Sequence, residues 1–391
     1  MTNQSEPLDT PSRARSRKKR KKTAWIYALL GVLLVIAVIA IYYIYSILSF
    51  AGHIQKTPDE SRIGTDDPDG GEQADPIPRW EGRERVNILL LGGDSRGLGK
   101  NEKPRSDTMI IVSIDPVTKK AHLLSVLRDT YGEIPGHGRD RINAAITYGG
   151  PELAMRTISN LTGLDIQYYV YTDFQGFIAL IDELGGIEFE VEKRMYYKDT
   201  NDDPMYHIDL KPGLQKMDGK TALAYVRFRH DALSDYTRTE RQRKFLTALA
   251  EKLKSTWSLI RLPALLDSIK PYVETNLKLD DMLKLAALGL EVDTSDITSA
   301  QLPPMELLRE ETIRGMSVIT VRDEQKLKAY VQELMAPEEP AAGEAGAEAA
   351  GAAGAAGADG TSGGGAGLDG ARQDGAGGTG RAGKAGTGGT R

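Results

Sequence analysis

The sequence predicts a single mixed-sheet α/β/α domain, preceded by one membrane-spanning helix and followed by a disordered tail. Three observations predict this arrangement. An uncharged apolar run covers residues 24–52, buried-strand patterns are interspersed with helical patterns through the middle of the chain, and Ala and Gly dominate residues 337–391. With 391 residues, of which 40% are hydrophobic and 27% charged, the chain is long enough for one sizeable core plus these appendages.

The N-terminal region is typical of a signal-anchor. Residues 1–23 are polar, contain a basic cluster, and are expected to form a disordered arm. The run 24–52 holds no charged residue, and about 20 apolar residues suffice to cross a bilayer as a helix. Because basic residues precede this run and acidic residues follow it, the positive-inside rule predicts a cytoplasmic N-terminus and an extracellular domain. A cleaved signal peptide is the alternative, but its apolar region is usually only about 7–15 residues long.

Composition marks the other boundaries. Residues 53–78 are rich in Asp, Gly, Pro and Glu, as expected of an extracellular linker. The segment 337–391 has no aromatic residue and cannot bury enough apolar surface to offset the entropy of ordering, so a disordered tail is predicted. One folded domain is left, over residues 79–336.

Within that domain, residues 86–92 form a nearly continuous apolar run ending in Gly-Gly, the pattern of a strand buried on both faces. Further strands are predicted over 109–114, 121–126, 168–171 and 187–191. Helices are predicted over 143–148, 151–161, 172–184, 218–226, 239–255, 263–273 and 280–288. Strands mixed with helices in this way indicate a layered α/β domain.

Arginines and carboxylates gather at the ends of the first three predicted strands: Asp94 with Arg96, Arg105 with Asp107, and Arg128 with Asp129. Ligands bind outside strand ends in open α/β sheets. Asp94 and Asp107 are hard oxygen ligands suited to Mg²⁺ or Mn²⁺, and arginines suit phosphate oxygens. For any one pair, an ordinary surface ion pair is the alternative.

A second cluster lies in residues 227–242, which contain Arg227, Arg229, Arg238 and Arg241. Arginine favours planar, bidentate contacts with carboxylate or phosphate oxygens, so this stretch is interpreted as an anion clamp. Arg238 and Arg241 are three residues apart and are predicted to share one face of a helix, with Asp235 as its N-cap. A solvated charged helix face is the alternative.

Several classes of function are excluded or disfavoured. The net charge of −5 gives no reason to expect a nucleic-acid partner, since such binders normally carry a basic excess. The chain has no cysteine, which excludes thiolate metal sites, disulfides and cysteine nucleophiles. The five histidines show no i, i+4 pair of the kind a helical zinc site needs.

Several motifs occurring in order resemble the LytR-CpsA-Psr family of cell-wall glycopolymer ligases. They are Asn87-Ile-Leu-Leu-Leu-Gly-Gly-Asp-Ser-Arg, Arg105-Ser-Asp-Thr-Met, Leu127-Arg-Asp-Thr-Tyr, Arg141-Ile-Asn-Ala-Ala and the stretch 223–242. The resemblance implies a domain that binds a polyprenyl-pyrophosphate-linked glycopolymer, such as teichoic acid or capsular polysaccharide, and transfers its phospho-glycopolymer to a peptidoglycan hydroxyl.

The resemblance also assigns residues. Asp94 and Asp107 match the family's divalent-metal ligands, with Mg²⁺ or Mn²⁺ as the expected cofactor. The positions expected to contact pyrophosphate are Arg105, Arg128, Arg227, Arg229, Arg238 and Gln242, and Asp235 and Arg241 belong to the same motif. Asp235 is either the general base or a group that orients Arg238. Leu127 stands where the family usually has proline, which frees φ, adds an N–H and is expected to loosen how Arg128 is aimed.

Two other functions remain open on the sequence. One is a phosphatase or pyrophosphatase that uses water as acceptor at the same site, and the other is a non-catalytic regulatory or binding protein of the cell envelope. A lipid substrate would also need an apolar cavity. The helices 172–184 and 239–255 carry apolar stripes from which one could be lined, although such stripes are more often core.

Overall fold

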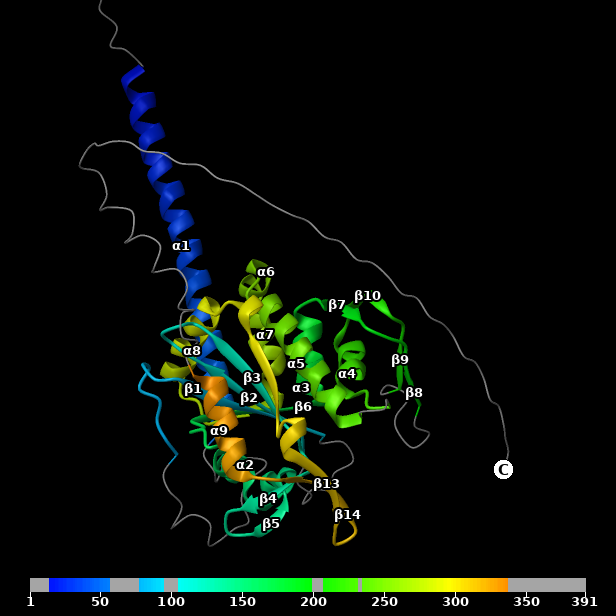
Figure 1. Ribbon diagram of the computed structural model, residues 1–391. Helices are drawn as coiled ribbons and strands as arrows, with labels where there is room; N and C mark the ends of the chain where they lie inside the picture. Colours follow the sequence, from blue (N-terminus) through cyan, green and yellow to red (C-terminus); the bar gives the residue numbers. More distant parts are fainter. Residues whose placement is uncertain (1–13, 57–76, 95–104, 199–206, 231–233, 337–391) are drawn as a thin grey trace, which may run out of the picture. The chain divides into compact units, whose positions relative to one another are not determined.

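The computed structural model describes residues 14–56, 77–94, 105–198, 207–230 and 234–336 (Figure 1). The chain divides into two units, Met1–Ala336 and Pro337–Arg391, and all described residues belong to the first. The tail predicted over 337–391, most of the linker and the first half of the N-terminal arm lie outside the described residues.

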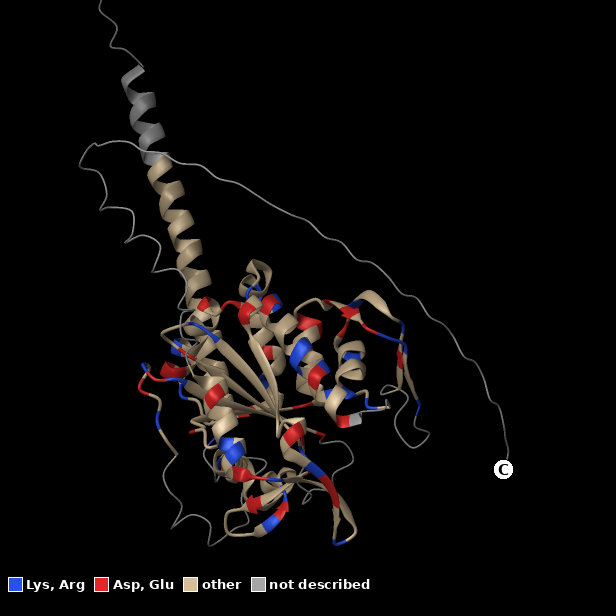
Figure 2. Ribbon diagram, viewed as in Figure 1, with Lys and Arg blue, Asp and Glu red and all other residues tan. Residues whose placement is uncertain are grey.

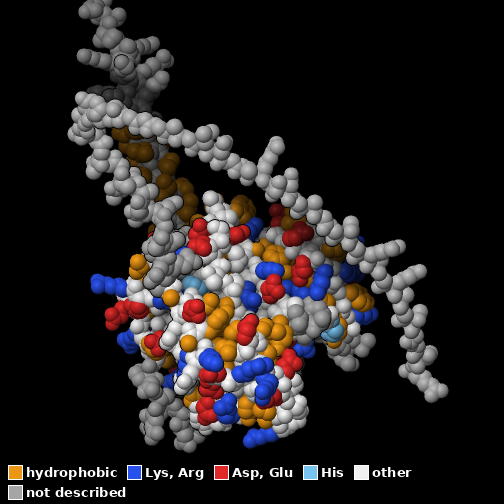
Figure 3. Space-filling view, viewed as in Figure 1, with side chains coloured by type: hydrophobic (Ala, Val, Ile, Leu, Met, Phe, Trp, Pro, Cys, Tyr) orange, Lys and Arg blue, Asp and Glu red, His pale blue; other side chains and the backbone are white. Residues whose placement is uncertain are grey.

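The first helix, α1, spans Ala14–Ile54. It begins inside the segment predicted to be a disordered arm, so that prediction is wrong for residues 14–23, where Lys, Arg and Ala all favour helix. Within α1, Trp25–Ile54 is long and apolar enough to cross a membrane, with a mean hydropathy of 2.6. Figure 2 shows this part of the helix without Lys, Arg, Asp or Glu, and Figure 3 shows it as an apolar column. A single-pass membrane anchor is therefore supported.

The domain is built on a six-stranded mixed sheet in the order β11-β6-β1-β2-β3-β12. Its strands are β1 (Val86–Gly93), β2 (Ser106–Ile114), β3 (Ala121–Val126), β6 (Tyr168–Asp173), β11 (Val273–Thr275) and β12 (Thr298–Leu302). β1, β2 and β3 are antiparallel neighbours, whereas β6 runs parallel to β1 and β12 parallel to β3. The carboxyl ends of β1 and β3 and the amino end of β2 therefore lie at the same end of the sheet, along the strand direction.

Helices cover both faces of this sheet, which confirms the α/β/α prediction. On one face, α2 (Ala145–Thr162) and α9 (Glu324–Met335) pack on Leu89, Leu91 and Ile111. The other face is covered by α3 (Phe174–Glu183), α5 (Ser234–Leu253), α7 (Leu262–Ile269) and α8 (Leu279–Glu291) (Figure 1). α2 joins the two helices predicted over 143–161 through a kink at Gly149-Gly150.

The remaining elements are smaller. A four-stranded sheet in the order β13-β14-β4-β5 contains β4 (Thr130–Ile134), β5 (Gly138–Arg141), β13 (Leu308–Ile313) and β14 (Met316–Val321). Two hairpin-like pairs are β7 (Ile187–Val191) with β10 (Gly213–Met217) and β8 (Met195–Tyr197) with β9 (Ile208–Leu210). Short helices are α4 (Gly219–Arg227), α6 (Thr256–Ile260), η2 (Ile142–Ala144), η4 (Lys270–Tyr272), η5 (Thr294–Asp296) and η6 (Met305–Leu307).

The last turns of α1 dock onto the domain. The side chains that face it recur with helical spacing, whereas Ile44, Tyr45 and Leu48 between them are more than half exposed. Those on the domain side are Tyr43, Ser46, Ile47, Phe50, Ala51 and Ile54. The Lys270 ammonium donates to Ser49 Oγ at 2.8 Å, and the Lys56 amide donates to the Thr275 carbonyl at 3.0 Å. The anchor is therefore packed against the folded domain.

Candidate active site

A cavity of about 930 Å³ lies between one face of the central sheet and the helices that cover it. This volume is at the upper end of the range of about 300–1,000 Å³ typical of ligand pockets. Most of its wall is apolar, and its charged side chains come from the end of the sheet where β1, β3 and β6 finish and β2 begins, and from the neighbouring segments of α4 and α5. The arrangement suits a molecule with a long apolar part and a charged head.

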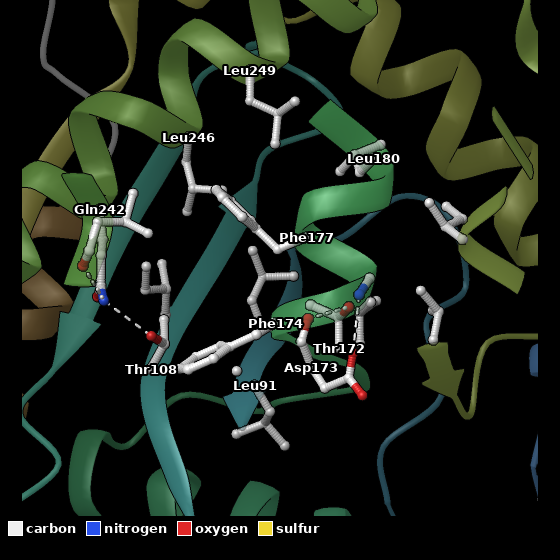
Figure 4. A pocket seen from close by; sticks show the side chains of 18 of the residues that line it. Leu91, Thr108, Thr172, Asp173, Phe174, Phe177, Leu180, Gln242, Leu246 and Leu249 are labelled. Atoms are coloured by element: carbon white, nitrogen blue, oxygen red, sulfur yellow. Dashed lines mark hydrogen bonds between the residues drawn. The ribbon is translucent and has the colours of Figure 1, made fainter. Parts of the chain in front are cut away.

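The apolar wall uses part of both predicted stripes. Phe177 and Leu180 of α3 and Leu246 and Leu249 of α5 point toward one another across the cavity (Figure 4). Ile178 and Ile181 of the same α3 stripe are instead buried in the core behind it. The stripe is thus partly core, as expected, and partly cavity wall.

The docked end of α1 supplies another part of the wall. Ile47, Phe50 and Ile54 line the cavity, together with Leu266 and Ile269 of α7. The segment predicted to cross the membrane is therefore continuous with one side of the cavity.

The structure brings most of the predicted site residues to the cavity. Those that line it are Asp94, Asp107, Arg128, Arg227, Arg229, Arg238 and Gln242. They come from sequence positions more than a hundred residues apart, and the antiparallel pairing of β1, β2 and β3 places the first three at a common edge. Arg96, also named from the sequence, lies outside the described residues.

Arg128 is held by carboxylates on several sides. Its guanidinium donates to Asp107 Oδ1, and its Nε lies 3.4 Å from Asp235 Oδ2 and 3.5 Å from Asp129 Oδ2. Burial disfavours the charged form, but Asp107, Asp235 and Asp129 outweigh burial and raise the pKa of Arg128 above its ordinary value. Arg128 is therefore a fixed cation in the cavity wall.

Arg238 is more deeply buried, with only 6% of its surface exposed. Its Nη2 lies 3.3 Å from Asp235 Oδ1, and its Nε has no hydrogen-bond partner within the part of the chain that the structure describes. Burial, and to a smaller extent the charge of Arg128, lower its pKa below the ordinary value, although Asp235 opposes this. Because Arg238 lines the cavity, the positive charge of its buried guanidinium is suited to attracting an anion there.

Three other polar residues of the cavity wall, Arg227, Arg229 and Gln242, differ in burial and in their contacts. Arg227, the last residue of α4, places its guanidinium 4.9 Å from the centre of the Phe174 ring. Arg229 is exposed. The Gln242 amide donates to Thr108 Oγ1 at 3.0 Å (Figure 4) and to the Val226 carbonyl at 3.3 Å, which ties α5 to β2 and α4.

Asp235 was predicted to be an N-cap, and this is wrong. α5 begins at Ser234, so Asp235 is in its first turn, and its carboxylate lies between Arg128 and Arg238. Asp235 is not among the residues that line the cavity. This geometry favours the orienting role over that of a general base.

Besides Asp235, two other predicted site residues, Arg105 and Arg241, do not line the cavity. Arg241 is buried. Its Nε donates to Glu192 Oε1 at 2.7 Å, and its Nη1 donates to the Phe228 carbonyl at 2.9 Å. Contrary to the prediction from the sequence, Arg238 and Arg241 therefore do not act together at the cavity. Residues three apart on a helix point about 60° away from each other, and here only Arg238 lines the cavity. Arg105 is exposed and acts electrostatically on Asp140 and Tyr148.

Leu127, which replaces the usual proline of the resembling family, is well fixed. Its N–H donates to the Leu302 carbonyl at 2.9 Å, and its side chain is buried beside Leu308 and Ile319. The added donor is thus satisfied by β12, so the expectation that Leu127 loosens the aim of Arg128 is not supported.

The structure adds site residues that sequence reasoning missed. Thr108, Thr172, Asp173 and His230 also line the cavity. The His230 ring stacks on Tyr197, with 3.8 Å between ring centres. Asp173 caps α3 by accepting from the Gly176 amide at 2.9 Å, so its position next to a helix start was the only signal available.

Asp94 and Asp107 are the two metal ligands that the sequence predicted. Both line the cavity at the arginine-rich end, and no group of three or more carboxylates or histidines suited to a metal occurs among the described residues. Mg²⁺ commonly binds through one or two carboxylates, with waters and substrate phosphates completing its shell. Asp94 and Asp107 provide two cavity-lining carboxylates, the number of protein ligands that such a site uses.

The fold and the cavity define a class: a membrane-anchored α/β protein with an arginine-rich anion site at one end of an apolar cavity. The chain belongs to the LytR_cpsA_psr family, whose model matches residues 48–335. This confirms the family resemblance that the motifs indicated.

Individual relatives agree with this assignment. The chain is 35% identical over 195 residues to the regulatory protein MsrR of Staphylococcus aureus (strain COL), covering 49% of this chain and 57% of that protein's length. It is 34% identical over 254 residues to the polyisoprenyl-teichoic acid–peptidoglycan teichoic acid transferase TagU of Enterococcus faecalis, covering 64% of this chain and 79% of TagU. A solved structure of TagT bound to LI-WTA, 28% identical, covers 66% of this chain and 93% of that chain with a TM-score of 0.52; TagT is also solved from Bacillus subtilis.

Proposed function

We propose that this protein is a phosphotransferase that moves a phospho-glycopolymer from a polyprenyl-pyrophosphate carrier to peptidoglycan. The observation that carries the proposal is the amphiphilic cavity, in which an apolar space of about 930 Å³ ends at Arg128, Arg227 and Arg238. A polyprenyl chain fits the apolar part, and a pyrophosphate fits the arginines. Its similarity to TagU, which is named a teichoic acid–peptidoglycan transferase, supports the same substrate class.

In the proposed reaction, a peptidoglycan hydroxyl attacks the phosphorus that bears the glycopolymer. A new P–O bond forms to the acceptor, the bond to the bridging oxygen breaks, and polyprenyl phosphate leaves. The attacking hydroxyl loses its proton to solvent water, and negative charge accumulates on the leaving phosphate. Phosphoryl transfer requires mainly positioning and charge neutralisation from the protein.

The arginines supply these functions. Arg238 lines the cavity as a buried guanidinium that Asp235 contacts, and Arg128 is held rigidly by Asp107 and Asp235. Because both are fixed before the substrate binds, little reorganisation is needed as charge develops on the leaving group. Asp235 acts as the positioning residue that spaces the two guanidinium groups.

A divalent cation belongs to this proposal as well. Asp94 and Asp107 would hold Mg²⁺ or Mn²⁺, which would neutralise phosphate oxygens when bound. In the described structure Asp107 contacts Arg128, so cation binding would compete with this ion pair. The arginines then remain as the direct contacts of the pyrophosphate.

The topology is proposed from charge. Basic residues precede the apolar segment of α1 and acidic residues follow it, which supports a cytoplasmic N-terminus and an extracellular catalytic domain. Polyprenyl-linked polymers and peptidoglycan meet on that side of the membrane.

The decisive experiment measures transfer from a lipid-pyrophosphate-linked saccharide to peptidoglycan by the full chain in vesicles. Arg238→Lys removes the planar fork but keeps the charge, so we expect transfer to fall by roughly tenfold or more. Arg243→Lys is the matched control, because Arg243 is an equally buried arginine of α5 that does not line the cavity. Product analysis separates transfer to peptidoglycan from hydrolysis. Release of glycopolymer phosphate without acceptor labelling, or equal effects of both variants, would contradict the proposal.

A further inference from the structure

The short helix α6 carries an apolar patch that the domain leaves uncovered. Trp257, Leu259 and Ile260 are 57%, 42% and 59% exposed. Ser258 of the same helix is buried, and its amide is capped by the Ser255 hydroxyl. Single exposed apolar residues are common on protein surfaces, but here three of the five residues of one helix are both apolar and exposed, and together they are called the α6 patch.

Hydrogen bonds connect the end of α6 and the start of α7 to Tyr43 and Ser46 of α1. The Tyr43 hydroxyl donates to the Ile260 carbonyl, and the Ser46 hydroxyl donates to the Pro263 carbonyl at 3.4 Å. In Figure 1, α6 lies at the end of the domain from which α1 emerges. The end of α6 is therefore fixed next to residues 43–46 of the anchor.

The length of the apolar segment of α1 places Tyr43 at a membrane surface. Trp25, where the apolar segment begins, is separated from Tyr43 by about 27 Å along a helix that rises about 1.5 Å per residue. The hydrocarbon core of a bilayer is about 30 Å thick. Aromatic residues gather at both ends of this interval, Trp25 and Tyr27 at one end and Tyr42, Tyr43 and Tyr45 at the other, as expected of interfacial belts.

The rest of α1 is not available to cross the membrane. Ile47, Phe50 and Ile54 line the domain's cavity, and Ala51 is buried. The apolar segment has 30 residues, about ten more than a bilayer requires, and the surplus corresponds to the docked turns. The boundary between lipid and domain thus falls near Tyr43.

We propose that α6 is a membrane-seating surface, which inserts Trp257, Leu259 and Ile260 into the interface of the bilayer that α1 crosses. The Arg261 guanidinium lies 5.8 Å from the centre of the Trp257 ring and pairs with Glu183 at 2.8 Å, a position suited to the headgroup layer. Seating α6 there fixes the domain against the lipid, with α7 and α1, which line the cavity, next to the bilayer. The inference rests on α1 crossing the membrane and is independent of the transfer reaction.

The test uses the full chain in phosphatidylcholine vesicles with and without brominated acyl chains, which quench nearby tryptophan. The chain has three tryptophans, and Trp25→Phe leaves Trp257 and the buried Trp80. We expect brominated lipid to remove roughly half of the Trp257 emission, since interfacial tryptophan lies close to the upper acyl chain. Trp25→Phe combined with Trp257→Phe gives the Trp80 baseline, and the difference between the two proteins belongs to Trp257.

A matched control places tryptophan on the opposite end of the domain. Met305 is 52% exposed and is the first residue of η6, which leads into β13; β13 lies far from α6 in Figure 1. Met305→Trp in the background without Trp25 and Trp257 should be insensitive to brominated lipid and fully quenched by aqueous iodide. If Trp257 behaves like this control, insensitive to brominated lipid and open to iodide, the membrane seat is overturned. Thermal midpoints of all variants identify any that fail to fold.

Discussion

Two buried arginines of α5 allow stability and activity to be tested separately. Arg241 donates to Glu192 and to the Phe228 carbonyl, whereas Arg238 lines the cavity with an Nε that has no hydrogen-bond partner in the described part of the chain. Replacing either by methionine keeps an unbranched apolar stem and removes the guanidinium. We expect Arg241→Met to destabilise the fold and Arg238→Met to reduce transfer strongly with little change in stability.

The magnitudes follow from the contacts. A hydrogen bond to a charged group contributes about 1.5–3 kcal/mol, and a buried acceptor left unsatisfied costs about 1–3 kcal/mol. The Glu192 side chain is 44% exposed and regains water, so the ion pair is discounted and Arg241→Met should cost about 2–4 kcal/mol of unfolding free energy. Arg238→Met removes a desolvated charge, and Asp235 keeps Arg128 as its partner, so the change should stay within about 1 kcal/mol.

The assays are thermal denaturation and transfer by the same protein preparations. A domain of this size shifts by about 2–4 °C per kcal/mol, so Arg241→Met should lower the midpoint by roughly 5–15 °C. Arg238→Met should leave the midpoint nearly unchanged and reduce transfer by roughly a hundredfold, the effect of losing one strong transition-state contact. Equal losses of stability in both variants, or normal transfer by Arg238→Met, would refute the division of roles.

Three further predictions concern the metal, the cavity wall and pH. Asp94→Ala or Asp107→Ala should sharply reduce Mg²⁺-dependent transfer while lipid binding partly survives, and wild-type turnover by both at limiting Mg²⁺ would contradict the metal site. Phe50→Ala should weaken binding of long polyprenyl donors more than short ones in a direct binding assay, and an equal effect on both would remove Phe50 from the lipid wall. Burial acts to raise the pKa of Glu192, but the hydrogen bond from Arg241 prevails and lowers it below the ordinary 4.5. The stability that this pair provides should be complete above about pH 4.5 and fall as the pH drops through the lowered pKa, so the difference in midpoint between wild type and Arg241→Met should shrink in acid.

Most of the strands that could be predicted are largely buried, although β7, with exposed positions between its buried ends, was predicted as well. β1 appears in the sequence as a nearly continuous apolar run, and burial along β3 is complete even at His122 and Ser125. β13 and the hairpin of β4 and β5 were missed because their buried positions alternate with exposed polar ones or are few. The parallel pairing of β12 with β3 joins segments more than 170 residues apart, which no local pattern specifies.

The sequence identified most of the charged residues that line the cavity, but it did not identify what each of them contacts. Asp94, Asp107 and Arg128 were recognisable because they stand at ends of strands that the apolar runs reveal. Whether an arginine of α5 faces the cavity or Glu192 depends on where the cavity boundary crosses the helix, and helical spacing alone places Arg238 and Arg241 together. The apolar cavity itself is a tertiary feature, since α3 divides its stripe between core and cavity.

The register of the sheet shows why the anchor matters for the proposed chemistry. Thr275 forms a bridge with Gln55 at the end of α1 and pairs with Val170, which in turn pairs with Leu90. From Leu90 to Asp94 the strand advances by about 13 Å at 3.3 Å per residue. The anchor therefore meets the sheet well away from the charged edge, and the cavity spans the distance between them. In the proposed reaction, a lipid whose pyrophosphate reaches Arg128 would have its tail along the wall that α1 completes, so the membrane helix would contribute to substrate binding as well as to attachment.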